Sequence, residues 1–436
     1  MQRVRMDKKI NLVYEWIGPN GPITNVRVPT LVDFMYAGVK DLHIHGYPYD
    51  AEQTPHFHKR VPAHRLVPTF NMPQDVFLYE LNFSQYHYKN VLNIFNARDG
   101  FLENNKISQD VIDRVRSKQG YFLITVLYES FVKDDFLFMM TRYFEEKQIP
   151  LTQIIYATNC ANGSEVYKNF CVRAGREPEI NMEYIPTFRI DKTNLEDVIA
   201  KYSTIEYNPG LRKKLFLCFN RRYSDHRLLF YTNVVKKGLL DKFYISMAKV
   251  QPESTSPFFS SMKYISQRLN QFEISDDDII VADGHLPLVL DSDDFNRYPM
   301  EANGLSMESY YTNSLVHIIS ETFFFDNYIH ITEKTYKPIA YMQPFIMMGA
   351  VGSLKHIKEM GFKTFDKYWD ESYDAITDPI ARMLKIYEIV DQIASWDEAK
   401  QLEFSRSVKD IVEFNVRHLS TMPNIEVDNF INKYGT

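Results

Sequence analysis

The stretch that decides the fold is SLVHIISETFFFDNYIHITEKTYKPIAYMQPFIMMGAVG, residues 314–352. Its first apolar run, 314–320, predicts a buried strand, and a second apolar run follows near its end. Between the two runs, Thr332 begins a predicted helix that carries Glu333 and Lys334. Strand, helix and strand in this order indicate a parallel βαβ unit. A cation at the N-terminus of such a helix is suited to bind a phosphate.

The same alternation of strands and helices extends along most of the chain. We predict strands at 120–130, 153–160, 213–220, 243–246 and 362–365, and helices at 134–148, 164–175, 226–240, 353–361, 379–396 and 403–420. The polar stretch 250–312 is expected to hold helices and loops. The fold class is therefore α/β, with two Rossmann-like domains facing a cleft and C-terminal helices packing back across it. Their predicted extents are 1–200 and 201–436.

Composition limits the classes of function. The chain has 436 residues, of which 45% are hydrophobic and 24% charged, as in soluble globular proteins. A net charge of −6 argues against a protein that coats nucleic acid through a broad basic face. Three cysteines suit a reducing compartment. The chain shows no signal peptide and no apolar run long enough to span a membrane, so we expect a cytoplasmic protein.

A basic turn follows the predicted strand 213–220. Its candidate donor-binding residues are Asn220, Arg221, Arg222, His226 and Arg227. Arginines at a helix N-terminus can bind a diphosphate bidentately, and the helix dipole adds to the attraction. The alternative is that Ser224 or Asp225 merely caps the helix while the arginines are solvated or paired with acids.

A second polar group follows the predicted strand 314–320. Its candidates are Glu321, Thr332, Glu333, Lys334 and Lys337. A carboxylate can bind a ribose diol, and an ammonium can bind a diphosphate. The alternative is that Glu333 offsets the helix dipole and Lys334 faces solvent. In open α/β sheets ligands bind beyond the carboxyl ends of the strands, so both groups are expected at one edge.

The run SETFFFDNYIHITEKTYKPIAYMQPFIMMG resembles the donor-site motif of the α-1,3-fucosyltransferase superfamily. The turn FNRRYSDHR resembles the basic turn that these enzymes carry earlier in the same domain. Together they resemble a glycosyltransferase of the two-Rossmann, GT-B type. The combination with GFKTFDKYWDESYD also resembles phage and giant-virus glycosyltransferases, which would place the protein in a host cytoplasm.

The resemblance implies a role for each matching residue. Glu333 and Lys334 match the pair that binds the nucleotide ribose and the diphosphate. Arg221 or Arg222 matches the phosphate-binding arginine, and Glu321 matches an acid near the sugar. The co-substrate would be a GDP- or UDP-linked sugar, with no further cofactor and no metal. Lys337 departs from the acidic residue usual after the motif, which leaves the sugar open.

Glycosyl transfer also needs a group that takes the proton of the acceptor hydroxyl. Glu129 is our candidate for this base, because it closes the predicted strand 120–130 at its carboxyl end. The alternative is a capping or surface acid. Lys334 and the arginines would stabilise the charge that develops on the leaving diphosphate, in an inverting reaction.

Acceptor-binding candidates come from the N-terminal half. His43 and His45 lie on one face of a predicted strand, and Asn159 and Asn162 follow another. The two histidines could be ligands of a metal ion, but no cysteine or carboxylate set completes such a site. The asparagines are alternatively turn residues. The closely spaced acids at 370–374 are interpreted as helix-start and surface residues.

The leading interpretation is transfer of a hexose or pentose to a glycan, a small molecule or, as in some phages, a hydroxymethylated DNA base. A non-catalytic nucleotide-sugar-binding module is the alternative. A dehydrogenase is disfavoured, since no G-x-G-x-x-G follows an early strand. The sequence leaves the oligomeric state open.

Overall fold

The computed structural model describes residues 6–14, 39–46, 66–68, 77–82, 107, 109–126, 132–190, 195–220, 222–250, 256–290 and 307–434. For the first three strands it describes the backbone path alone. The chain divides into two compact units. The first unit contains Met1–Ile190 together with Pro423–Thr436, and the second contains Asp191–Met422.

The first unit is built on a seven-stranded sheet in the order β3-β2-β1-β4-β5-β6-β7. Every pair of neighbouring strands is parallel. The strands are β1 (Met6–Tyr14), β2 (Val39–Gly46), β3 (Leu66–Pro68), β4 (Phe77–Asn82), β5 (Gly120–Val126), β6 (Ile154–Thr158) and β7 (Asn181–Tyr184). The chain winds outward from β1 to β3, returns to β4 beside β1, and winds the other way. This is the doubly wound order of a Rossmann-like sheet.

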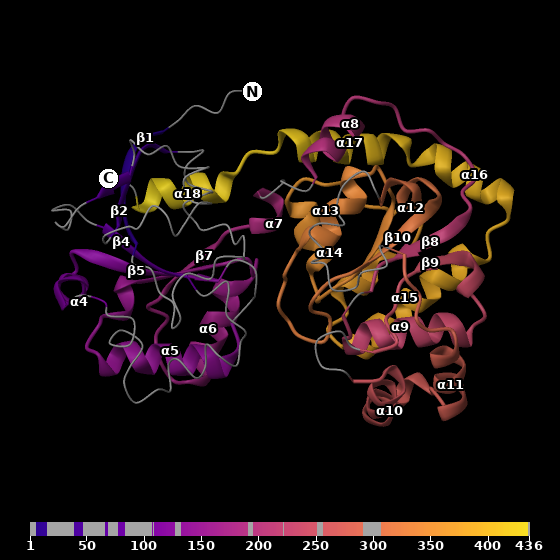
Figure 1. Cartoon of the computed structure of the whole chain (residues 1–436), viewed down its shortest axis with the longest axis horizontal. Helices are drawn as coiled ribbons and strands as arrows, with labels where there is room; N and C mark the ends of the chain where they lie inside the picture. The colour runs from indigo at the N-terminus through magenta and orange to yellow at the C-terminus, as the bar shows by residue number, and fades with distance from the viewer. Residues whose placement is uncertain are drawn as a thin grey trace. The chain divides into compact units, whose positions relative to one another are not determined.

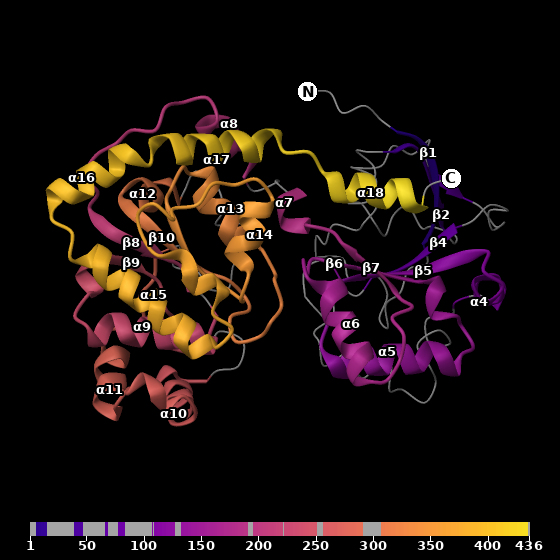
Figure 2. The same cartoon turned by 180° about the vertical axis from the view of Figure 1, so that it is seen from behind.

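Helices cover both faces of this sheet. They are α4 (Gln109–Arg116), α5 (Asp134–Glu146), α6 (Gly163–Arg173), α7 (Thr187–Ile190) and α18 (Ile425–Tyr434), with the short η3 (Leu151–Gln153) before β6. Figure 1 shows α4, α5 and α6 on one face and α18 on the other, and Figure 2 shows the same layers from behind.

The last helix, α18, is tied to the first unit by side chains. Arg189, 2% exposed, forms an ion pair with Glu426. At the other end of the helix, Lys433 Nζ lies 2.7 Å and Tyr434 Oη 2.6 Å from Glu183 Oε1. These contacts explain why the final residues belong to the first unit although the preceding helices belong to the second.

The second unit has a four-stranded parallel sheet in the order β11-β10-β8-β9. The strands are β8 (Lys214–Cys218), β9 (Phe243–Ile245), β10 (Ser314–Ser320) and β11 (Phe345–Met348). Every residue of β10 and β11 is buried, as expected for strands covered on both faces. The winding reverses between β8 and β10, so the topological switch point lies there.

Helices also cover both faces of the second sheet. They are α8 (Glu196–Tyr202), α9 (Asp225–Lys236), α10 (Phe258–Arg268), α11 (Asp276–Gly284), α12 (Glu308–Thr312), α13 (Glu333–Ala340), α14 (Ser353–Glu359), α15 (Pro379–Ala394), α16 (Glu398–Ser407) and α17 (Lys409–Thr421), with the short η4 (Leu240–Lys242), η5 (Asn270–Phe272) and η7 (Glu371–Ala375). Figure 1 shows α9 and α15 on one face and α12, α13 and α17 on the other. Phe230 of α9 contacts Tyr387 of α15, with ring centroids 6.1 Å apart.

The predicted α/β class with two Rossmann-like parallel sheets is confirmed. The domain boundary predicted near residue 200 falls in α8, which packs against α17 in the second unit. Among the described residues, no helix combines the length and apolar character needed to cross a membrane.

The prediction of a strand at 362–365 is wrong. Side chains take up its backbone donors: Lys363 N donates to Asn415 Oδ1 (2.8 Å) and Phe365 N to Glu371 Oε1 (2.8 Å). The segment therefore forms no ladder with a neighbouring strand. The single helix predicted at 403–420 is two helices, α16 and α17, which meet at Val408.

Candidate functional site

The candidate site consists of the two segments that follow β8 and β10, and we name it the switch-point site. In the first segment, residues 219–224 lead from β8 into α9. In the second, residues 321–332 lead from β10 into α13. Because β8 and β10 are parallel neighbours, both segments leave the same edge of the sheet. Ligands of open α/β sheets bind at this position.

Asn220 anchors the segment after β8. It is fully buried, its N–H donates to Ser246 Oγ (3.0 Å), and its side-chain amide donates to Cys218 Sγ (3.2 Å). Its Oδ1 has no hydrogen-bond partner among the described residues. Arg221 lies outside the described residues, whereas Arg222 is exposed. A solvent-facing guanidinium at this position is accessible to a ligand.

Two side chains of α9 fasten this segment to the end of β10. Arg227, 6% exposed, donates from Nη2 to the carbonyl oxygen of Ser320 (3.0 Å) and from Nε to its Oγ (3.2 Å). His226, also buried, donates from Nε2 to the carbonyl oxygen of Glu321 (2.9 Å). The two polar segments are therefore held together directly across the switch point.

The protonation of these two side chains follows from their burial. Burial lowers the pKa of His226 well below its ordinary range, and the charge of Arg227 lowers it further. The imidazole is thus neutral, with its proton on Nε2. Burial also lowers the pKa of Arg227, against the attraction of the Glu321 carboxylate. Arg227 still contributes positive charge, because arginine begins from a pKa far above neutrality.

Glu321 is occupied by internal hydrogen bonds. Its carboxylate, 1% exposed, accepts from Thr332 N (3.0 Å), Thr332 Oγ1 (2.7 Å) and Thr335 Oγ1 (2.6 Å). These bonds join the two ends of the loop 322–331 in the manner of an Ω-loop. Thr332 in turn caps α13, since its Oγ1 accepts from Lys334 N (3.3 Å).

Glu333 and Lys334 occupy the first turn of α13 and are partly accessible. Their side chains are 25% and 27% exposed, and Lys334 Nζ lies 3.4 Å from Glu333 Oε1. Burial alone would raise the pKa of Glu333, but Lys334 and Lys337 more than offset it and lower the pKa to about 2. Glu333 is therefore a carboxylate at any physiological pH, beside ammonium groups that can receive an anion.

The loop 322–331 has an inward-pointing ring, Phe324, near its start, and His330 and Ile331 are buried near its end. Phe324 is 1% exposed and stacks on the His226 ring, with centroids 5.5 Å apart. The guanidinium of Arg382 also lies 4.6 Å from the ring centroid and donates to the Phe324 carbonyl oxygen. Phe323 and Tyr328, both half-buried, contact each other edge to face at 5.6 Å.

Sequence reasoning missed Phe324, Thr335 and Arg382. A readable signal existed for Arg382, because it shares the apolar face of α15 with Ile386 and Ile393 and is itself only 2% exposed. An arginine on such a face needs buried acceptors, and here Ile376 O (2.6 Å) is one of them. The identity of those acceptors could not be read from the sequence.

The acceptor candidates of the first unit follow β6. Asn159 is fully buried and its Oδ1 accepts from Thr187 N (3.1 Å). Asn162 is half-buried at the start of α6, and its Oδ1 accepts from Cys160 Sγ (3.2 Å). His43 and His45 lie in β2, but their side chains fall outside the described residues, as does Glu129 altogether. Their roles stay predictions.

The acids at 370–374 have structural partners. Asp370 caps η7, and Glu371 pairs with Lys358 (2.9 Å). Asp374 is buried and accepts from Leu354 N and Lys355 N, each at 2.8 Å. Within the part of the chain that the structure describes, no group of three histidine, cysteine or acidic residues could hold a metal ion.

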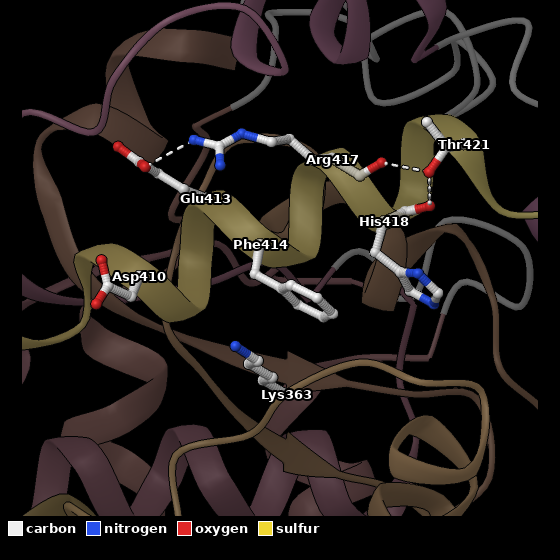
Figure 3. A pocket seen from close by; sticks show the side chains of 7 residues that line it. All are labelled: Lys363, Asp410, Glu413, Phe414, Arg417, His418 and Thr421. Atoms are coloured by element: carbon white, nitrogen blue, oxygen red, sulfur yellow. Dashed lines mark hydrogen bonds and ion pairs between the residues drawn. The ribbon is translucent and has the colours of Figure 1, made fainter.

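A hollow of about 450 Å³ lies elsewhere on the second unit, along α17. Figure 3 shows Lys363 and Phe414 pointing toward each other within it, with the ammonium 4.2 Å from the ring centroid. The ion pair of Glu413 with Arg417 borders it. None of the residues predicted for donor binding lines this hollow.

Comparison with known proteins finds distant structural likenesses. No protein-family model matches the chain, and no curated protein matches it. The α,α-trehalose 6-phosphate synthase of Burkholderia multivorans is 10% identical, with a TM-score of 0.46, over 99% of this chain and 96% of that chain. A glycosyltransferase of Rickettsia africae is 11% identical, with a TM-score of 0.38, over 98% of each chain.

A third structure is HepE of Anabaena in complex with UDP and glucose. It is 8% identical, with a TM-score of 0.37, over 97% of this chain and 98% of that chain. At such identities and TM-scores the likeness assigns no activity to this chain. Its function has to be derived from the switch-point site.

Proposed function

We propose that this protein is a glycosyltransferase that uses a nucleotide-sugar donor, bound by the switch-point site of the second unit. One observation carries the proposal. The carboxylate of Glu333 and the ammonium of Lys334 sit partly exposed on the first turn of α13, at the sheet edge that Arg227 and His226 fasten to the basic turn.

The charge of the site suits a diphosphate. Arg227, Lys334 and Lys337 supply three positive charges against the carboxylates of Glu333 and Glu321, and the Glu321 oxygens are engaged by Thr332 and Thr335. Lys334 and the dipole of α13 act at the position where the leaving diphosphate would gain charge. This supports transfer without a metal ion.

The ribose has a matching partner in Glu333. A carboxylate accepts hydrogen bonds from a vicinal diol, and the depressed pKa of about 2 keeps Glu333 in that state. A neighbouring ammonium 3.4 Å away then meets the adjacent diphosphate. Glu333 and Lys334 would thus bind two consecutive parts of one nucleotide, the ribose and the diphosphate.

The proposed reaction is an inverting displacement. The acceptor hydroxyl oxygen attacks the anomeric carbon, the bond from that carbon to the diphosphate oxygen breaks, and the diphosphate leaves with the electron pair. The hydroxyl proton passes to the predicted base Glu129. Glycans, small molecules and hydroxymethylated DNA are the proposed acceptor classes, the sugar is a hexose or pentose, and a cytoplasmic location stays a prediction.

The test is binding followed by turnover. Thermal unfolding is recorded with GDP, UDP, CDP and ADP, each with and without a divalent cation. A ligand of the native state must raise the melting temperature, so at least one nucleotide is expected to do so without metal. The matching nucleotide sugars are then assayed for diphosphate release with each acceptor class.

Three outcomes discriminate. No shift with any nucleotide contradicts the proposal. A higher melting temperature without diphosphate release for any acceptor indicates a binding module and contradicts the proposed enzymatic activity. Turnover of Glu129→Gln at the wild-type rate removes Glu129 as the base and leaves the donor site intact.

A further inference from the structure

The hydroxyl of Thr332 has every hydrogen-bonding position filled. A threonine hydroxyl can donate one bond and accept two. It accepts from Lys334 N (3.3 Å) and from Lys334 Nζ (3.2 Å). Both of these groups are donors only, so the hydroxyl proton must point to Glu321 Oε2, 2.7 Å away.

Glu321 accepts this hydrogen bond through one of its two side-chain oxygens. Its other oxygen, Oε1, accepts from Thr332 N (3.0 Å) and Thr335 Oγ1 (2.6 Å). Glu321 is buried beneath the loop 322–331, whereas Lys334 reaches solvent. The carboxylate therefore acts on Lys334 through one hydroxyl without contacting the ligand itself.

We infer that Glu321 is a positioning residue, which orients the Thr332 hydroxyl so that it holds the Lys334 ammonium ready for the diphosphate. This inference rests on the proposed donor site and assigns Glu321 a role different from direct contact with the sugar. Without the hydroxyl, Lys334 Nζ would keep, among the described residues, its contact with Glu333 Oε1 at 3.4 Å. The two side chains would then neutralise each other.

Glu321→Gln tests this with the same side-chain shape. One orientation of the amide turns its NH₂ toward Thr332 Oγ1, which must then accept a third bond and lose Lys334 Nζ. The other orientation turns the NH₂ toward Thr332 N, which leaves that backbone donor buried without an acceptor. Loss of the bond from Lys334 Nζ affects a side chain, which can move more easily than the backbone N–H of Thr332. We therefore expect the first orientation, with Lys334 displaced.

The control is Thr335→Val, which keeps the shape of the side chain and removes a different bond to the same carboxylate. Affinities for inorganic pyrophosphate, UDP and GDP are measured by isothermal titration at equal folded concentration. Loss of one charge-assisted contact predicts about tenfold weaker binding for Glu321→Gln and less than about twofold for Thr335→Val. A general loss of packing would affect both variants alike.

A double-mutant cycle with Lys334→Met separates positioning from other effects. If Glu321 acts through Lys334, then Glu321→Gln adds no further loss in the Lys334→Met background. An equal loss in both backgrounds overturns the inference, as does equal weakening by Thr335→Val.

A ligand-free crystal structure of Glu321→Gln decides the inference independently of nucleotide binding. Lys334 Nζ displaced from Thr332 Oγ1 supports the positioning role, even if wild type binds none of the three ligands and the proposed function fails. Lys334 Nζ still at hydrogen-bond distance from Thr332 Oγ1 overturns it.

Discussion

Glu333 illustrates how a single side chain at this site is set by its neighbours. Burial opposes its ionisation, but the two lysines of α13 overcome that effect and lower its pKa to about 2, from an ordinary 4.5. A folded-state pKa below the unfolded value stabilises the protein fully above the unfolded value. That stabilisation is lost as the pH falls from 4.5 toward 2.

Glu333→Gln is therefore expected to have a lower free energy of unfolding than wild type at pH 6. At pH 3 the same difference is expected to be smaller. The difference in unfolding free energy should narrow by about 1 to 2 kcal/mol between these pH values, because the wild-type contribution is being lost. Urea unfolding of both proteins at each pH provides the measurement. A difference that stays constant or widens toward pH 3 contradicts the assigned pKa.

Gly361 is a residue where a side chain does not fit. Its φ is +91°, and a Cβ there would lie 2.8 Å from Nε2 of His418, which itself donates to the Met360 carbonyl oxygen (2.8 Å). Gly361→Ala should lower the free energy of unfolding by roughly 1 kcal/mol or more, in addition to the cost of the backbone strain. The control is Gly238→Ala, whose φ is +67° with open space around the position. If Gly361→Ala and Gly238→Ala lower the melting temperature equally, the added methyl group at 361 does not clash with His418.

Residue types in the sequence predicted which side chains would stand at the start of α13 better than they predicted contacts. The pattern of Glu333 and Lys334 after a strand indicated a donor site, and both are partly exposed at a helix N-terminus. Positions after strands also placed Glu321 among the donor candidates and Asn159 among the acceptor candidates, whereas hydrogen bonds within the fold engage both. Such bonds join residues distant in the sequence, and no local pattern encodes them.

The loop 322–331 is the element that would shape the site above α13. Glu321 and Thr332 close its base, while Phe324 packs against both His226 and Arg382. Phe323 and Tyr328 are half-buried and contact each other. A loop held at its base and by the buried ring of Phe324 is expected to be ordered before ligand arrives.

Phe324→Ala should cost roughly 3 to 5 kcal/mol, as for other large aromatic side chains removed from a core. It should also speed amide hydrogen exchange throughout 322–331, because the ring is the inner attachment of the loop. Phe325→Ala, at a half-buried neighbour, serves as the control. Exchange that is unchanged in Phe324→Ala would mean that the loop is fixed by other contacts.

Elements were predictable where periodicity and burial agree. The continuous apolar runs of β10 and β11 were recognised because strands buried on both faces need no polar alternation. The segment 362–365 is only partly apolar, and its N–H groups at Lys363 and Phe365 donate to side chains and not to a strand. Whether an apolar run forms a strand thus depends on which groups elsewhere in the chain pair with its backbone, and its own residues do not specify them.

At the scale of the whole molecule, the chain builds two α/β units and returns to the first at its end. Sequence patterns predicted two units because strand and helix alternate in both halves. They did not assign the last residues to the first unit, because that assignment depends on Arg189, Glu183 and their partners on α18.

Glu426→Ala leaves the guanidinium of Arg189 buried without its carboxylate, which typically costs about 3 to 5 kcal/mol. We expect a lower melting temperature and faster proteolysis within the first unit. The control is Glu206→Ala, which breaks the ion pair with Lys409 but at a side chain that is 84% exposed, and no measurable change is expected. Equal effects of the two substitutions would contradict a specific attachment of α18.

The central claim is that α13 presents Lys334 to the diphosphate of a nucleotide at the switch point of the second sheet. Isothermal titration of UDP and GDP into wild type, Lys334→Ala and Lys355→Ala tests it most directly, since Lys355 is a surface lysine of the same unit, 76% exposed. The claim predicts that the nucleotide bound by wild type loses about tenfold or more in affinity with Lys334→Ala and little with Lys355→Ala. Equal affinity of wild type and Lys334→Ala would contradict it.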